Sequence, residues 1–298
     1  MLTWFALPTA VLLTATAADV ALNGPPFGGT GPSRAAGSLP VPVPASPEET
    51  SPAPEASGPP GTGTVSPGPS TSAPGAGGLS GRTIAIDPGH NGRNYAHPEV
   101  INRKVNVVTG TKACNTTGTQ SRDGYAEHAF TWDLANRLAA AVLRAEGATV
   151  VLTRDSDTGV GPCITERAAI GNRAHADLAL SLHADGGPTT GRGFHVIMPG
   201  SVGPNAAIVA PSARLGRILR DAFRAGTGEP VADYIARNGL TTRTDLGGLN
   251  LSTVPAVFLE CGNMRNAADA RSLADPGWRQ DAATAIATGL TTYLAPPP

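Results

Sequence analysis

Two histidines and two glutamates stand where apolar segments of the chain end or begin. His90 follows the apolar segment TIAID and a Pro-Gly turn, His183 comes late in LALSLHAD, and Glu260 closes VPAVFLE. Glu127 opens a long segment whose apolar residues have helical spacing. Two neutral imidazoles and a carboxylate are a ligand set of catalytic zinc, which keeps one position open for water. A second carboxylate nearby would be the general base that this water needs.

Each of these residues also has an ordinary explanation when it is taken alone. His90 could be a histidine in a surface turn, and His183 could be a core histidine with its hydrogen bonds satisfied. Glu127 could be an acidic residue at a helix start, where the helix dipole favours it. Glu260 is more informative, because burying a carboxylate without a partner is costly. The four together favour a metal site with Zn2+ as the expected ion.

The elements that must position these residues alternate between strand and helix. Strand patterns are found at 83–87, 148–154, 178–185, 193–199 and 256–262, and helical patterns at 127–147, 164–176, 210–226 and 277–294. This alternation predicts an α/β fold, a single domain with a mostly parallel twisted sheet and helices on both faces. In open sheets of this kind, sites lie at the carboxyl ends of the strands, where the candidate ligands are expected to converge.

The domain occupies only part of the 298 residues. Residues 24–80 consist almost entirely of Pro, Gly, Ser, Ala and Thr, which offer too little apolar surface to offset the entropy of ordering. We expect this segment to be a disordered linker and 81–298 to be the catalytic domain. Residues 1–23 are apolar and then small, as in a signal peptide, and the apolar run is short for a membrane span. We therefore expect export, with cleavage or N-terminal tethering both open, and no stable membrane insertion.

Charge and cysteine content limit the partners and the compartment. The net charge of -1 provides no basic field for nucleic acid, and we expect a monomer that does not bind nucleic acid. An exported protein with three cysteines would tend to pair two of them. Cys114 and Cys163 lie in irregular segments that a covalent link would stabilise, whereas Cys261 follows an apolar strand. We predict a Cys114–Cys163 disulfide and a buried free thiol at Cys261.

Four blocks of the sequence, in order, resemble the zinc-dependent N-acetylmuramoyl-L-alanine amidases of the AmiC-like (amidase 3) family, most of all its short secreted actinobacterial members. The blocks are IAIDPGHNG, EHAFTWDLANRLAAAVLRAEGATVVLTR, ERAAIGNRAHADLALSLHAD and VPAVFLECGNMRNAADA. The resemblance implies that His90, Glu127 and His183 bind zinc and that Glu260 is catalytic. The family usually has asparagine where Asp185 stands, and its late block differs from ECGNMRNAAD; these departures concern contacts with substrate.

The implied reaction is hydrolysis, in peptidoglycan, of the amide between N-acetylmuramic acid and L-alanine of the stem peptide. Water activated by zinc would attack, and Glu260 would act as general base. Arg243 is a candidate for gripping a substrate carboxylate, or else a solvated loop arginine. Asp87 could accept an N–H from a ligand histidine ring, or simply form the turn before proline. The other histidines are interpreted as structural or surface residues: His97, His128, His175 and His195.

Two other functions fit parts of this pattern. A zinc peptidoglycan carboxypeptidase could use the same ligand set and would release D-alanine instead of an intact stem peptide. A non-catalytic cell-wall binding module on a proline-rich tether would not need the four site residues. Their presence together favours the amidase.

Overall fold

The computed structural model describes residues 78–144 and 146–296, and the structural statements that follow concern these residues. The predicted export segment 1–23 and the predicted linker up to residue 77 lie outside them. Leu79 already belongs to the folded part, since its side chain is fully buried in the main core and its backbone N–H donates to the Glu146 carbonyl. The domain thus includes the last three residues of the predicted linker.

A six-stranded sheet in the order β4-β1-β5-β8-β6-β7 forms the centre of the domain. Its strands are β1 (Thr83–Pro88), β4 (Thr149–Leu152), β5 (Leu178–Asp185), β6 (His195–Pro199), β7 (Leu240–Arg243) and β8 (Ala256–Asn263). Neighbouring strands are parallel except for β6 and β8. The predicted, mostly parallel α/β sheet is confirmed, and β7 is an addition, since its short polar sequence LTTR carries no alternation of apolar residues.

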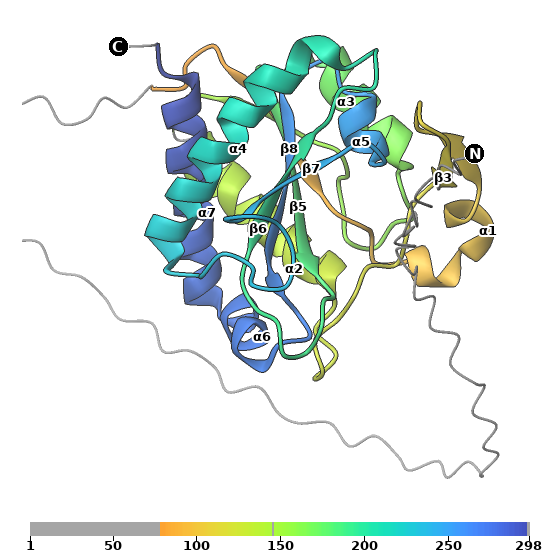
Figure 1. The fold of residues 1–298 in the computed structure, drawn as a ribbon, viewed down its shortest axis with the longest axis vertical. Helices are drawn as coiled ribbons and strands as arrows, with labels where there is room; N and C mark the ends of the chain where they lie inside the picture. Colours follow the sequence, from red (N-terminus) through yellow and green to blue (C-terminus); the bar gives the residue numbers. More distant parts are fainter. Residues whose placement is uncertain (1–77, 145, 297–298) are drawn as a thin grey trace, which may run out of the picture. The chain divides into compact units, whose positions relative to one another are not determined.

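Helices cover both faces of the sheet, as predicted (Figure 1). They are α1 (Pro98–Ile101), α2 (Glu127–Asn136), α3 (Ile164–Arg173), α4 (Ala206–Thr227), α5 (Gly247–Asn250), α6 (Ala267–Ala274) and α7 (Pro276–Leu294). The short 3-10 turn η1 (Asn94–Ala96) precedes α1, and α2 continues into the wider π-helical turns of η2 (Arg137–Leu143). Helices α4 and α7 lie on one side of the sheet, and α3 and α5 lie on the other.

The alternation of side chains along the strands divides the sheet into a core face and a site face. Ile84 and Ile86 of β1 and Leu180 of β5 point into the large core beneath α2, α4 and α7, where they are fully buried. The intervening residues of the same strands include Asp87 and His183, which point to the opposite face. Because side chains alternate between the two faces, the same strands both build the core and present the polar residues.

A small antiparallel hairpin, β2 (Lys104–Asn106) and β3 (Thr111–Ala113), precedes the first predicted disulfide cysteine. Cys114 and Cys163 are bonded, with Cα atoms 4.4 Å apart, and Cys261 is a buried free cysteine. Both predictions are confirmed. The Ile164 N–H also donates to the Cys114 carbonyl at 2.7 Å. The disulfide and this hydrogen bond together join the hairpin region to the start of α3.

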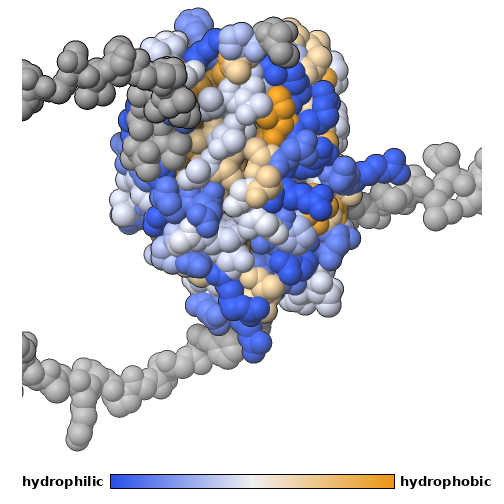
Figure 2. All heavy atoms as spheres, turned by 90° about the vertical axis from the view of Figure 1, so that its left-hand side faces the viewer, coloured by the Kyte–Doolittle hydropathy of each residue, from blue (hydrophilic) through white to orange (hydrophobic). Residues whose placement is uncertain are grey.

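The outer surface on the side of α4 and α7 is mainly hydrophilic with scattered apolar residues (Figure 2). These helices therefore direct their apolar faces inward, in agreement with the fully buried Leu219, Phe223 and Leu290. None of the helices in the described part of the chain is both long enough and apolar enough to cross a membrane.

Candidate active site

The histidine after β1 occupies a backbone conformation that few non-glycine residues adopt. His90 has φ 61°, in the left-handed region, where a non-glycine residue is uncommon and its backbone is strained. The preceding Gly89 is required for a different reason, because a Cβ atom there would lie 2.3 Å from the His183 ring. In this turn, Gly89 leaves space for the His183 ring, and the strained backbone directs the His90 side chain.

His90, Glu127 and His183 converge to form a compact group of three donors. Oε1 of Glu127 lies 3.1 Å from Nε2 of His90 and 3.0 Å from Nδ1 of His183. One ligand atom from each residue lies within 4.8 Å of the others, and this is the group in the described structure that could hold a metal ion. Three ligands bound to zinc at tetrahedral angles would be about 3.3 Å apart, so the separations fit zinc. Two imidazole nitrogens and a carboxylate oxygen also suit zinc chemically.

Hydrogen bonds and stacking fix the orientation of the three side chains. Nδ1 of His90 lies 3.1 Å from the Thr116 carbonyl, which leaves Nε2 for the site. The Thr119 N–H donates to Oε2 of Glu127 at 2.9 Å. Phe258 stacks on the His183 ring at a centroid distance of 5.2 Å. Burial acts to raise the pKa of Glu127, but the two imidazoles outweigh it and hold that pKa well below its ordinary value; the carboxylate is thus ready to bind a cation.

Glu260 lies beside this group, on the next strand of the sheet. It pairs directly with His183 in the parallel register of β5 and β8, and both border a cleft of about 350 Å3. Burial, followed by the negative charges of Glu127 and Asp185, raises the pKa of Glu260 well above its ordinary value. A carboxylate in such a setting takes up a proton readily, which is the property of a general base.

Asp87 has partners other than the ligand histidine that is one of the two roles suggested by the sequence. Its carboxylate accepts hydrogen bonds from the Thr153 and Ser181 hydroxyls and from Nη1 of Arg167, at 2.5 to 2.6 Å. In the described structure it has no hydrogen bond to a histidine ring. Burial acts to raise its pKa, but Arg167 and the two hydroxyls outweigh it and lower the pKa to about 2. The role of accepting from a ligand ring falls instead to the Thr116 carbonyl.

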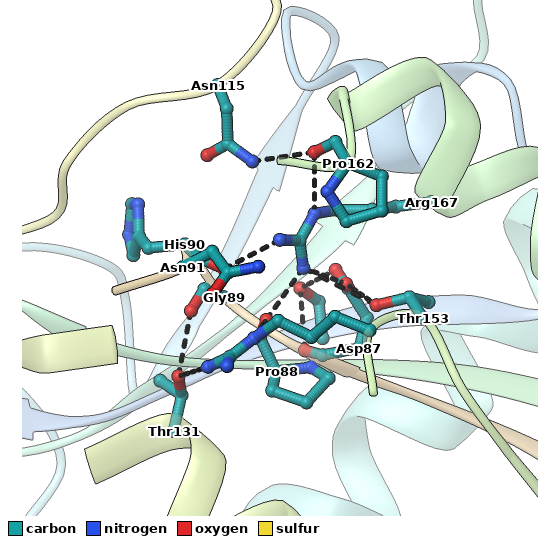
Figure 3. Close-up of polar contacts among 12 residues, drawn as sticks. Asp87, Pro88, Gly89, His90, Asn91, Asn115, Thr131, Thr153, Pro162 and Arg167 are labelled. Atoms are coloured by element: carbon teal, nitrogen blue, oxygen red, sulfur yellow. Dashed lines mark hydrogen bonds and ion pairs between the residues drawn. The ribbon is translucent and has the colours of Figure 1, made fainter. Parts of the chain in front are cut away.

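Arg167 is the centre of the network behind His90 (Figure 3). Besides Asp87, its guanidinium donates to the backbone carbonyls of Pro88, His90, Gly161 and Pro162 at 2.6 to 3.0 Å. The arginine comes from α3 and is 6% exposed. It therefore fixes the strained backbone of the His90 turn from outside the metal group.

Arg154 supports the same turn from the other side. It donates to the Pro88 carbonyl at 3.0 Å and to the His128 carbonyl at 2.9 Å. The His128 ring pairs with Asp157 at 2.8 Å, away from the metal group, as expected for a residue next to a ligand on a helix. Of the remaining histidines, His97 is a partly exposed partner of Glu99, and His175 lies just beyond the end of α3.

Arg243 ends β7 and borders the cleft, so it is not on a loop. Its guanidinium is paired with Asp245 at 2.6 Å, and Lys112 of the hairpin binds the same carboxylate at 2.9 Å. A substrate carboxylate would therefore meet an arginine whose position is set by Asp245.

Arg167, Arg154 and the Asp185–Tyr234 pair were not predicted from the sequence. The Tyr234 hydroxyl donates to Asp185 at 3.0 Å at the rim of the cleft. Arg167 left a recognisable signal: it shares the buried face of α3 with Gly171, and a charged residue on the buried face of a helix needs partners.

Comparisons with known proteins agree with this geometry. The family model described as N-acetylmuramoyl-L-alanine amidase matches residues 84–292. The amidase Rv3717 of Mycobacterium tuberculosis is 44% identical over 219 residues, which are 73% of this chain and 88% of that protein. The crystal structure of the amidase Ami1 from Mycobacterium smegmatis has a TM-score of 0.68 and 43% identity, over 72% of this chain and 98% of that one. Ami1 from Mycobacterium abscessus has a TM-score of 0.69 and 40% identity, over 73% and 100%. The resemblance inferred from the sequence is thus confirmed, and the chain belongs to the N-acetylmuramoyl-L-alanine amidase family.

Proposed function

We propose that this amidase is zinc-dependent and hydrolyses the amide between N-acetylmuramic acid and L-alanine of the stem peptide, with Glu260 as general base. The observation that carries the proposal is the register of β5 and β8, which sets Glu260 directly beside His183 of the three-donor group. When bound by His90, Glu127 and His183, zinc would supply a Lewis acid that polarises the scissile carbonyl and acidifies water.

The chain's own residues then have separate tasks. Glu260 takes a proton from the attacking water and returns it to the departing amine of L-alanine. Arg243, held by Asp245, is placed at the cleft to bind a carboxylate of the stem peptide. Arg167 and Arg154 keep the His90 turn in its strained conformation, which preserves the approach of the metal donors.

We also propose that the protein acts outside the cytoplasm, where peptidoglycan is found. The Cys114–Cys163 disulfide supports this location, because disulfides persist in oxidising compartments. The apolar residues 1–23 would direct export or tether the domain.

A pair of isosteric variants tests the assignment of the two glutamates. Glu260→Gln should keep one equivalent of zinc and lose at least about 100-fold in stem-peptide release, within the range of general acid–base catalysis. Glu127→Gln should lose zinc affinity together with activity. Metal content and initial rates are measured for both variants, with muropeptide products identified by mass spectrometry.

Three results would contradict the proposal. Loss of zinc from Glu260→Gln but not from Glu127→Gln would mean that the two roles are exchanged. A wild-type rate for Glu260→Gln would remove its role as base. Release of D-alanine in place of the stem peptide would identify a carboxypeptidase.

A further inference from the structure

His195 extends the row of polar side chains that His183 and Glu260 begin. It opens β6 and pairs directly with Glu260 in the antiparallel register of β6 and β8, while Glu260 pairs with His183 on its other side. Residues directly opposite each other in a sheet share a face, with Cβ atoms about 5 Å apart. His183, Glu260 and His195 therefore stand side by side across three strands, on the site face.

The imidazole of His195 is buried, and one of its ring nitrogens lacks a hydrogen-bond partner in the described structure. The residue is 2% exposed, and its Nδ1 has no hydrogen-bond partner among the described residues. An unpaired polar atom in the interior destabilises a protein, and such atoms in native structures call for an explanation. Packing does not supply one, because the next residue on the same face of β6 is the apolar Ile197, so an apolar side chain would suit this face.

Two other charged groups that act on His195 are already engaged with partners of their own. Burial has the largest effect on the pKa of His195 and lowers it. Asp185 acts to raise that pKa, and Arg243 acts to lower it. Asp185 accepts from the Tyr234 hydroxyl, and Arg243 is paired with Asp245. A neutral imidazole offers one donor and one acceptor. Within the row, the side chain that remains to receive a hydrogen bond from Nδ1 is the carboxylate of Glu260.

We propose that His195 is a positioning residue of the active site, which donates a hydrogen bond from Nδ1 to Glu260 during turnover and orients that carboxylate toward the cleft. In the described structure the two side chains form no hydrogen bond, and the short cross-strand spacing allows a rotamer change to bring them together. The inference rests on the proposed role of Glu260 as general base. It replaces the interpretation of His195 as a purely structural histidine.

Two substitutions separate positioning from packing. His195→Phe keeps the ring volume and removes the nitrogens, whereas His195→Asn keeps an amide nitrogen near the position of Nδ1. For the phenylalanine variant we expect one equivalent of zinc, a melting temperature at or above that of the wild type, and at least a tenfold lower kcat with KM changed less than twofold. The asparagine variant should recover most of kcat. His97→Phe, the same change at a partly exposed histidine outside the site, is the matched control and should alter none of these values.

A double variant tests whether His195 acts through Glu260. If it does, His195→Phe should slow the Glu260→Gln enzyme by less than twofold, because residues that act as a unit are not additive. Failure of the proposed function would be visible separately, as a wild-type rate in Glu260→Gln alone.

The proposal is overturned by a wild-type kcat in His195→Phe, by an equal loss in both backgrounds, or by a lower melting temperature that asparagine does not restore. If the phenylalanine variant does not fold, His195→Gln replaces it, since its amide lies nearer the position of Nε2. A tenfold loss of kcat with glutamine but not with asparagine would then support the role of Nδ1 as the donor to Glu260. Equal rates for the two variants would refute that role.

Discussion

The two halves of the sheet differ in how completely the buried polar groups on them and beside them are paired. On the side of β1 and β4, Arg167 and Arg154 direct their donors to carboxylates, hydroxyls and backbone carbonyls around the His90 turn. The buried side-chain atoms that lack a hydrogen bond in the described structure all lie on or against β6, β7 and β8: Arg192 Nε, His195 Nδ1, Thr241 Oγ1, Asn250 Oδ1 and Asp269 Oδ1. Arg192 Nε and Asp269 Oδ1 are 3.2 Å apart, close enough for an ion pair but not aligned for a hydrogen bond.

This difference matches two tasks of the site: to hold the metal donors in place and to move protons. The metal donors have to keep a fixed geometry, and a fully paired network over-determines the strained turn that carries His90. The β6–β8 side carries the proposed base, whose partners change as protons move. Unpaired polar groups cost stability there, and functional sites are where such costs are tolerated.

The largest effect should follow from breaking the paired side. Arg167→Met removes the cation from Asp87 and leaves four carbonyls without this donor, so we expect a loss of about 3–5 kcal/mol in the free energy of unfolding. Zinc affinity should fall as well, because the His90 backbone loses its clamp. Denaturant unfolding and metal titration measure both quantities.

Arg173→Met, on the same helix but in an exposed ion pair with Glu166, is the control and should change stability by less than about 1 kcal/mol. Similar losses for the two arginines would show that the network is not special.

A smaller effect should appear in the pH dependence of stability. The pKa of Asp87 is about 2 in the folded protein against an ordinary value of 3.8. Its ionised form therefore stabilises the fold above pH 4, and this contribution of about 2 kcal/mol is lost as the pH falls through 2. The stability difference between wild type and Asp87→Asn should shrink by about that amount between pH 5 and pH 2. Unfolding curves in urea at a series of pH values measure it, and a constant difference would refute the assignment.

The last test makes the same substitution on each of the two sides. Thr153→Val removes a hydroxyl that donates to the Asp87 carboxylate, and should cost about 1.5–3 kcal/mol, as for hydrogen bonds to charged groups. Thr241→Val removes the unpartnered hydroxyl of β7, and should leave stability unchanged or raise it by up to about 1 kcal/mol. Thermal unfolding of both variants at neutral pH decides the matter. A cost at Thr241 equal to that at Thr153 would erase the distinction between the two sides.

The metal group could be predicted from the sequence because its residues are tied to strand ends. The segments around His90, His183 and Glu260 have clear strand patterns, and the carboxyl ends of parallel strands meet at one edge of a sheet. Glu127 followed from the resemblance and from its place at the start of a strongly periodic helix. The fold class followed from the same alternation, which is a robust signal in a long chain.

The supporting contacts could not be predicted, because they depend on backbone atoms and on long-range packing. The acceptor for Nδ1 of His90 is the carbonyl of Thr116, which any residue type could supply. Neither of the two roles that the sequence suggests for Asp87 includes Arg167, because nothing in the local sequence points to a partner 80 residues further along the chain. Strand β7 is short and polar, so it adopts its conformation by pairing with β6 rather than through its own pattern.

The ends of the folded domain lie together at the edge of the sheet opposite the cleft. Leu79 is buried just before β1, and the Arg82 guanidinium lies 3.3 Å from the carbonyl of Leu294, the last residue of α7. From there β1 runs its full six residues, about 20 Å, before it reaches the His90 turn. A partner protein or solid support fused at either end would therefore face away from the catalytic groups.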